Sequence, residues 1–224
     1  MTGIVIKAQK TPAIAQDLID RWAKIPVTII SDVLVGKGLL PLDIKPLRLL
    51  GEPVRLAGLA RTAACQSPDF GAVMHAVNTI QAGEVLVIAA GGDSRIAYIG
   101  EVLGGVLRDQ HAAGVVCDGA VRDAGALSRI KELPVYTRAT TAHGPLAKDQ
   151  GIVNGPVMID NVSIAPGDLI LGDEDGVICL SPETASDRID AAEAQVAVED
   201  TWIRQLGEGV PFQSVFGLSN VDES

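Results

Sequence analysis

Three consecutive segments decide the fold of this chain: EVLVIAA (84–90), IAYIGEVLGGVLRDQH (96–111) and GVVCD (114–118). The first and the third are short, nearly continuous apolar runs, which is typical of strands buried on both faces. The segment between them is predicted to be helical. A strand, a helix and a second buried strand in this order predict a βαβ unit, in which the two strands are parallel.

The same alternation continues on both sides of this unit. Upstream we expect a strand over 55–66 and a helix over 70–81, and downstream a helix over 124–131 and a strand over 134–136. Beyond residue 155 the pattern changes to hairpins, with turns at Pro166-Gly167 and Asp175-Gly176. The expected hairpin strands cover 156–160, 162–165, 168–172 and 177–180. The fold class is therefore α/β with a partly parallel sheet.

Helices are expected at both ends of the chain. Residues 13–24 have an amphipathic pattern, Ser31 is a candidate N-cap of a second short helix, and 37–53 are predicted to be irregular. Near the other end, Ser181-Pro182-Glu183 is favourable at a helix start. An apolar stripe follows, with Glu199 in its gap: Ala185, Ile189, Ala192, Val196, Ile203 and Leu206.

No linker or repeat divides the sequence, so we expect one domain over 1–224. It would consist of an N-terminal helical extension over about 1–50, a core over about 51–180 and a C-terminal helix over about 182–207.

Charge and composition exclude several classes of partner. The formal net charge is −10, whereas nucleic acids and anionic membranes need a basic footprint, so we expect neither. No apolar stretch approaches the roughly 20 residues of a membrane span. The apolar run at the start of the sequence is too short for a signal peptide. The cysteines are scattered, which predicts buried thiols in a reducing compartment and not a disulfide or zinc framework. The expected location is the cytoplasm.

Arg122 and Asp123 are the candidate centre of an active site. They follow the buried strand 114–118, and a glycine turn would present them together at its end, where open α/β sheets bind ligands. An Asp can hold Mg²⁺ or Mn²⁺, and an Arg can grip a carboxylate with its planar fork of donors. The helix start at 100–103 can add backbone N–H groups that favour an anion. A structural ion pair at a turn is the alternative explanation.

The spacing of these residues resembles that of the RraA-like family. Its motif resembles two segments of this chain, Gly100-Glu101-Val102-Leu103 and Val121-Arg122-Asp123, with 20 residues between Glu101 and Arg122. The similarity extends over most of the chain, for example at Ile30-Ser31-Asp32 and Pro166-Gly167-Asp168. The family includes 4-hydroxy-4-methyl-2-oxoglutarate and 4-carboxy-4-hydroxy-2-oxoadipate aldolases, which also decarboxylate oxaloacetate. The implied fold is an αββα sandwich or barrel with a swivelling-domain-like core and a long C-terminal helix.

The resemblance also implies roles for individual residues. Asp123 would bind a divalent metal, Mg²⁺ or Mn²⁺, largely through water, and Arg122 would hold the keto-acid end of a small 2-oxo acid. The metal would polarise the 2-keto group and stabilise the pyruvate enolate left after cleavage. Glu101 would lie near the metal waters, and the backbone of Gly100, Glu101, Val102 and Leu103 would cradle the carboxylate.

The family's quaternary structure gives Glu199 its implied role. The implied assembly is a homotrimer or homohexamer with sites at subunit interfaces, where Glu199 of a neighbour approaches the metal. An acid on a packed helix face needs a partner, which also favours a role for Glu199. The alternative for Glu101 is an acid that only stabilises the first turn of its helix. The alternative for Glu199 is a half-exposed helix residue without a functional role.

One position departs from the family pattern. Family aldolases carry an acid three residues after the Asp, where this chain has Ala126. Without this acid, which would lie close to the metal's ligands, the identity of the aldolase substrate is less certain than the binding of a metal. The alternative function is that of the RraA proteins, non-catalytic regulators that bind and inhibit a ribonuclease. The regulators resemble a shorter core, so the extended ends of this chain favour catalysis.

Overall fold

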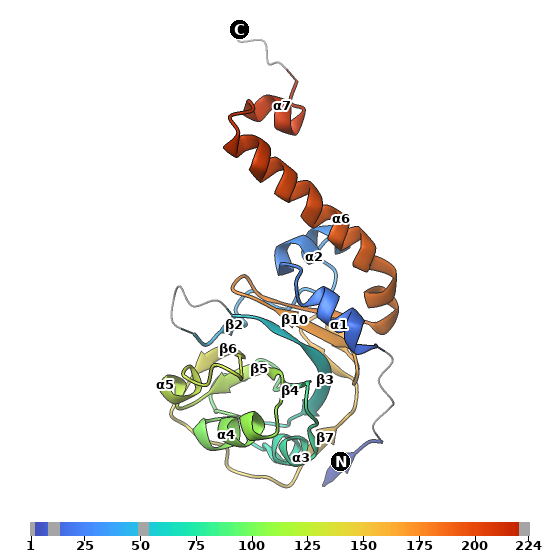
Figure 1. The fold of residues 1–224 in the computed structure, drawn as a ribbon. Coiled ribbons are helices and arrows are strands. Elements are labelled where there is room, and N and C mark those ends of the chain that lie inside the picture. The colour runs from blue at the N-terminus through green and yellow to red at the C-terminus, as the bar shows by residue number, and fades with distance from the viewer. Residues whose placement is uncertain (1–2, 9–13, 49–53, 220–224) are drawn as a thin grey trace.

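The computed structural model describes residues 3–8, 14–48 and 54–219. Its centre is a curved sheet that contains four neighbouring parallel strands (Figure 1). In spatial order these are β3 (Leu56–Ala64), β4 (Glu84–Ala89), β5 (Gly114–Val121) and β6 (Val135–Thr140). The predicted α/β class with a partly parallel sheet is therefore confirmed.

Three helices connect these strands: α3 (Gly71–Thr79), α4 (Glu101–Asp109) and α5 (Ala124–Leu127). Figure 1 shows them together on one side of the sheet. The predicted helix 96–111 is too long at both ends. Residues 96–100 are not helical because they pair with the end of β5, where Ala97 bridges Ala120 and Tyr98 N donates to Ala120 O at 2.9 Å. The predicted helix 124–131 likewise shortens to the four residues of α5.

The apolar runs bury both faces of the sheet, as their composition predicts. In β4, Leu86 and Ile88 pack under α3 to α5, whereas Val85 and Val87 point into the core enclosed by the curved sheet. Successive side chains of a strand point to opposite faces, so one run contributes to two cores. This pattern requires the strand to be covered on both sides.

Most of the remaining strands extend the large sheet, and a separate two-stranded sheet packs on the inner core. The two predicted hairpins are present as antiparallel pairs, β8 with β9 and β10 with β11. Three short strands lie where the sequence indicated none, and their pairing partners are distant in the chain. The bounds are β1 (Ile4–Ile6), β2 (Lys45–Pro46), β7 (Gly151–Val153), β8 (Val157–Ile159), β9 (Val162–Ile164), β10 (Leu169–Gly172) and β11 (Val177–Leu180).

The helices near the N-terminus are α1 (Gln16–Trp22) and α2 (Val27–Leu34). Residue 13 of the predicted helix 13–24 lies outside the described residues. The prediction that Ser31 caps the second helix is wrong, because Ser31 lies inside α2. The start of α2 is capped instead from the β10–β11 turn, where the Asp173 carboxylate accepts from Val27 N at 2.8 Å.

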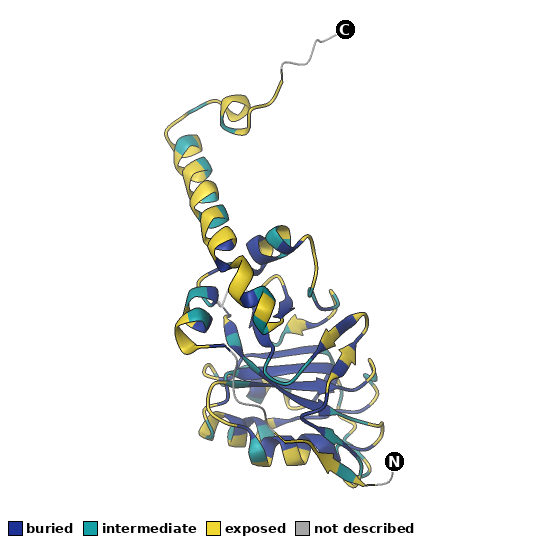
Figure 2. Cartoon of the chain, turned by 90° about the vertical axis from the view of Figure 1, so that its right-hand side faces the viewer, coloured by how far each residue is buried: buried dark blue, intermediate teal, exposed yellow. Residues whose placement is uncertain are grey.

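The C-terminal helix α6 (Pro182–Gly207) begins and ends where the sequence predicts, and Ser181 caps it by accepting from Thr184 N. Its first turns bury Ala185, Ile189 and Ala192 against α1, α2 and the β10–β11 hairpin. Its far half and α7 (Phe212–Phe216) extend away from the sheet and are largely exposed (Figure 2). No helix in the described part of the chain is long and apolar enough to cross a membrane.

We predict that Asp173→Ala lowers the free energy of unfolding by about 2–3 kcal/mol, measured by urea denaturation at fixed protein concentration. The Asp173 side chain is buried and accepts from Val27 N and Asp175 N, so its removal leaves buried donors without an acceptor. Asp175→Ala, in the same turn but exposed, is the control and should change stability by less than about 0.5 kcal/mol. Equal effects of the two substitutions would contradict the capping role.

Candidate active site

Strand β5 places Arg122 and Asp123 at its carboxyl end. The strand runs on to Val121 through an irregularity between Cys117 and Ala120, so the prediction that it ends in a turn at Gly119 is wrong. Arg122 N donates to Ile99 O at 2.9 Å, which holds the segment before α4 against this end. Asp123 has a φ of 55°, a left-handed conformation that Asp tolerates, and it begins α5.

The start of α4 lies directly against Asp123. Glu101 N donates to Asp123 Oδ2 at 3.0 Å. At Gly100, an added Cβ would lie 2.5 Å from Asp123 Oδ2 and 2.8 Å from Arg122 Cγ. A side chain at position 100 would have to displace Asp123 and Arg122, so glycine permits the close approach of the helix start to the acid.

The Arg122 guanidinium is only loosely tied to its neighbour. Its Nε lies 3.8 Å from Asp123 Oδ2, and the two side chains are 49% and 44% exposed. Ion pairs of this kind contribute little to stability, which argues against a purely structural role. Gly144 makes room for the guanidinium on its other side, because a Cβ there would lie 2.8 Å from Arg122 Nη1.

Two cavities meet at Arg122 and Asp123. The first, about 240 Å³, lies over the start of α4. The second, about 520 Å³, opens along the loop after β6. Besides the Arg–Asp pair, the first is lined by Phe70, Met74, Ala97, Tyr98, Ile99, Gly100, Val102, Leu103 and Pro145, and the second by Ala124, Thr140, Thr141 and Ala142.

The first cavity combines an apolar wall with a few polar groups. The first-turn N–H groups of a helix have no partner inside the helix, and Val102 and Leu103 carry such groups beside the cavity. The N–H of Glu101 is already taken by Asp123. Burial raises the pKa of Tyr98 to about 12, so this lining phenol stays protonated at neutral pH. An anion with an apolar portion matches this lining.

The predicted residues are only partly brought together. Gly100, Val102, Leu103, Arg122 and Asp123 share one cavity. Glu101 contacts Asp123 through its backbone, but its side chain lines neither cavity.

Glu199 lies far from this site in its own chain. Its Oε1 accepts from Gln195 Nε2 at 3.3 Å on the far half of α6. Figure 1 shows that part of α6 on the side of the sheet opposite α4 and α5. Glu199 could therefore reach an Arg122–Asp123 pair only in a second copy of the chain.

Sequence analysis missed the other walls of the cavities. Gly144 and Pro145 lie in the loop after β6, where a glycine–proline pair signals a turn but not its neighbours. Residues 97–99 were predicted to be helical, which would have removed them from the wall. Phe70 and Met74 come from the start of α3, and only the packing of α3 beside α4 reveals their place.

The residues present fit a metal that keeps most of its water. No group of three or more His, Cys, Asp or Glu side chains gathers for metal binding in residues 3–8, 14–48 and 54–219. Asp123 is a half-exposed carboxylate whose Oδ2 is oriented by Glu101 N, and Oδ1 remains for a ligand. Mg²⁺ commonly binds through one or two carboxylates and retains several waters, so this donor set is compatible with Asp123 as the anchor.

Known proteins resemble this chain over most of its length. It is 35% identical over 194 residues to a candidate 4-hydroxy-4-methyl-2-oxoglutarate aldolase of Halalkalibacterium halodurans, covering 87% of this chain and 90% of that protein. It is 32% identical to a 4-hydroxy-4-methyl-2-oxoglutarate aldolase of Thermus thermophilus, covering 71% of this chain and 93% of that protein.

A solved structure agrees with these sequence matches. The RNA-processing inhibitor RraA from Thermus thermophilus superposes with a TM-score of 0.62 at 30% identity, covering 70% of this chain and 93% of that chain. The sequence also matches the family described as RraA-like, Aldolase/RraA, over residues 20–179. This chain belongs to the RraA-like family.

Proposed function

We propose that this protein is a divalent-metal-dependent lyase that forms pyruvate. Its substrates would be a 4-hydroxy-2-oxo diacid such as 4-hydroxy-4-methyl-2-oxoglutarate and, by decarboxylation, oxaloacetate. The observation that carries the proposal is the contact of Gly100 and Glu101 with Asp123, which puts a helix start, an Arg and a metal-compatible carboxylate at one cavity. The names of the two aldolase relatives support the same reaction class.

The chain's own groups would bind and orient the substrate. Arg122 would hold the carboxylate next to the 2-oxo group, since its half-exposed guanidinium offers paired donors. The N–H groups of Val102 and Leu103 would add attraction for that anion. Asp123 would hold the metal together with water molecules, and Mg²⁺ or Mn²⁺ bound there supplies Lewis-acid polarisation of the 2-oxo group.

Cleavage breaks the C3–C4 bond, one carbon removed from the 2-oxo group, so its electrons can delocalise onto that carbonyl. In the aldol case the C3–C4 bond breaks, its electron pair stays with the pyruvate half, and a base takes the proton of the 4-hydroxyl. In the decarboxylation the bond to the leaving carboxylate breaks and CO₂ departs. The pyruvate half then takes a proton at C3. Glu199 of a second copy is our candidate base, with Glu101 near the water that relays protons.

A second copy would complete the site, in a trimer or hexamer. Trp202, Phe212 and Phe216 gather at the far end of α6 and α7, with ring centroids 5.1 Å and 4.6 Å apart, although aromatic residues make up only 3% of the chain. Phe212 is 59% and Ile203 69% exposed, so this end has apolar surface to bury.

The rim of the first cavity offers a matching surface. Exposed apolar side chains surround it on α3, α4 and the loop after β6: Met74, Val102, Val106 and Leu146. If the far end of α6 and α7 of one copy docks on the rim of another, the contact is head-to-tail, and such contacts form a ring when the rotation between copies closes. Such a ring would bring Glu199 of one copy toward Asp123 of the next.

The second candidate function is that of a non-catalytic inhibitor of RNA processing. The RraA structure from Thermus thermophilus favours it, because that chain is 30% identical to this one. That structure covers 70% of this chain, whereas the candidate aldolase of Halalkalibacterium halodurans covers 87%. The candidate aldolase of Halalkalibacterium halodurans also has the higher identity, 35%, and two relatives carry the aldolase name, which is why we place the lyase first.

The first prediction concerns metal-dependent release of pyruvate. With Mg²⁺ or Mn²⁺, the protein should form pyruvate from 4-hydroxy-4-methyl-2-oxoglutarate or oxaloacetate, measured by coupling to lactate dehydrogenase. EDTA should abolish the reaction. Asp123→Asn should lower kcat/KM by at least about a hundredfold, because the metal loses its anchor. No metal-dependent pyruvate from either substrate would reject the lyase proposal, and full activity of Asp123→Asn would reject the site.

The second prediction concerns the close approach at Gly100. Gly100→Ala should lower kcat/KM by about a hundredfold, because the added methyl group displaces Asp123 and Arg122. Gly105→Ala, in the same helix, is the control: its Cβ would meet no atom within 4 Å, so activity should be unchanged. Steady-state kinetics and melting temperatures of both variants provide the comparison. A Gly100→Ala variant as active as Gly105→Ala would refute the constraint.

The third prediction tests the shared site by complementation. Glu199→Gln and Asp123→Ala should each be nearly inactive. Refolding an equal mixture of the two should restore about a quarter of the wild-type activity, because random assortment in a ring pairs the intact Asp123 of one copy with the intact Glu199 of the next. No recovery in an assembly that light scattering shows to be mixed would argue against a site shared between copies.

A further inference from the structure

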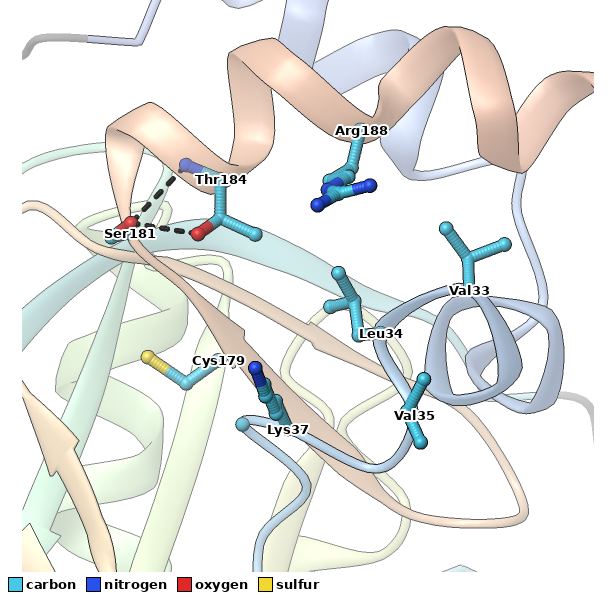
Figure 3. Close-up of a pocket in the computed structure, with 9 residues that line it drawn as sticks. Val33, Leu34, Val35, Lys37, Cys179, Ser181, Thr184 and Arg188 are labelled. Atoms are coloured by element: carbon cyan, nitrogen blue, oxygen red, sulfur yellow. Dashed lines mark hydrogen bonds between the residues drawn. The ribbon is translucent and has the colours of Figure 1, made fainter.

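A separate cavity lies on the other side of the molecule, between α2 and the start of α6. Its volume is about 640 Å³, larger than either cavity at Arg122 and Asp123. Figure 3 shows it between the end of α2, strand β11 and the first turns of α6. Its lining is Val33, Leu34, Val35, Lys37, Gly38, Cys179, Ser181, Thr184 and Arg188. No residue of the candidate active site is among them.

The charged groups in this lining are both cations. They are Lys37, in the turn after α2, and Arg188, in the second turn of α6. In Figure 3 the side chains of both extend into the space between α6 and the end of α2. Within the described residues neither forms an ion pair, although the chain has 28 acids and only 18 Lys and Arg residues. Two unpaired cations facing one cavity in an acidic protein attract an anion.

The backbone fixes the position of Lys37. Gly38 has a φ of 83°, and a Cβ there would lie 2.2 Å from Cys179 O. Cys179 N donates to Gly38 O at 2.9 Å, so the turn after α2 is attached directly to β11. The turn therefore has little freedom to move. The backbone of Lys37 therefore has a defined position on the cavity wall, which lowers the entropy lost when its side chain is ordered by a bound ligand.

The hydroxyl groups of the lining are already used in capping. Ser181 Oγ accepts from Thr184 N at 3.2 Å and lies 3.0 Å from Thr184 Oγ1, as Figure 3 shows. Pro182 has no N–H to offer at the first helical position. An anion here would therefore depend on the Lys37 and Arg188 side chains more than on the N-terminus of α6.

A second cavity of about 440 Å³ continues from the first and shares Val35, Lys37, Gly38, Cys179 and Ser181 with it. Its other walls combine apolar Leu39 and Val162 with polar Asn161, Ser163 and the buried Asp168. Asp168 Oδ2 accepts from Ala165 N at 2.8 Å. These groups are suited to hydrogen bonds with hydroxyl groups of a ligand.

We propose that this pair of cavities binds a small hydroxylated anion, with its phosphate or carboxylate group between Lys37 and Arg188. The hydroxyl-bearing part would lie toward Asn161, Ser163 and Asp168. Val35, 86% exposed at the rim, would contact the carbon skeleton. The site is separate from the candidate active site, and its existence does not depend on the proposed lyase reaction.

The test is isothermal titration of the full chain with inorganic phosphate, at constant ionic strength because salt screens such attraction. A parallel titration with malonate separates phosphate from carboxylate recognition. The variants are Lys37→Gln and Arg188→Gln, each of which removes one exposed cation. Lys131→Gln removes an exposed cation elsewhere, and Arg122→Gln removes the anion-binding group of the candidate active site. Melting temperatures verify that all variants fold.

We expect saturable binding of phosphate or malonate at the Lys37–Arg188 site, apart from any anion that binds at Arg122. Lys37→Gln and Arg188→Gln should each weaken it about tenfold, the effect of losing one charge-assisted hydrogen bond. Lys131→Gln should bind as the wild type does, and Arg122→Gln should keep the binding that Lys37→Gln weakens. Any of three results would overturn the proposal. The first is equal affinity in all five proteins, and the second is loss of binding in Arg122→Gln. The third is no saturation with either anion up to the order of tens of millimolar.

Discussion

The contact between the start of α4 and the end of β5 is the constraint on which the site depends. Gly100 lies so close to Asp123 that a side chain at position 100 would displace the carboxylate, and the next residue donates its N–H to it. One oxygen of Asp123 is thereby fixed and the other left for a ligand. The contact also brings the first-turn N–H groups of α4 next to Arg122, so backbone N–H groups, a guanidinium and a carboxylate share one cavity.

The sheet provides this contact through its register. Ala89 pairs with Asp118, and the segment after β4 pairs with Ala120 before α4 begins. The chain thus passes the end of β5 in a non-helical conformation and becomes helical only at Glu101. A helix that began at residue 96 would occupy this path and separate Gly100 from Asp123. The late start of α4 is therefore a requirement of the site.

Local sequence patterns predicted the parts of the fold that local physics controls. The apolar runs at β4 and β5 and the Ser181-Pro182 start of α6 carry their own signals, because burial and capping act over a few residues. Residues 96–100 were mispredicted because their pairing with β5 is a tertiary contact. The cap of α2 was misassigned to Ser31 for the same reason, since its acceptor is Asp173, distant in sequence.

The candidate site also has some parts that local sequence predicts and others that depend on tertiary contacts. The spacing of Gly100 and Arg122-Asp123 allowed their meeting to be predicted, and the structure brings them together. The wall at Gly144 and Pro145 depends on how the loop after β6 folds back, which no local pattern encodes. Glu199 lies on the far half of α6, away from the site of its own chain. Its role can be decided only in an assembly, so it rests on family resemblance and not on geometry within one chain.

The most direct test of a metal and keto-acid site at Asp123 and Arg122 is Mn²⁺ binding followed by electron paramagnetic resonance, with and without oxalate as a planar mimic of the pyruvate enolate. We expect oxalate to tighten Mn²⁺ binding in the wild type. Asp123→Asn should weaken Mn²⁺ binding by at least about tenfold. Arg122→Gln should still bind Mn²⁺, but oxalate should no longer tighten that binding. Equal Mn²⁺ affinity in the wild type and Asp123→Asn would contradict the account.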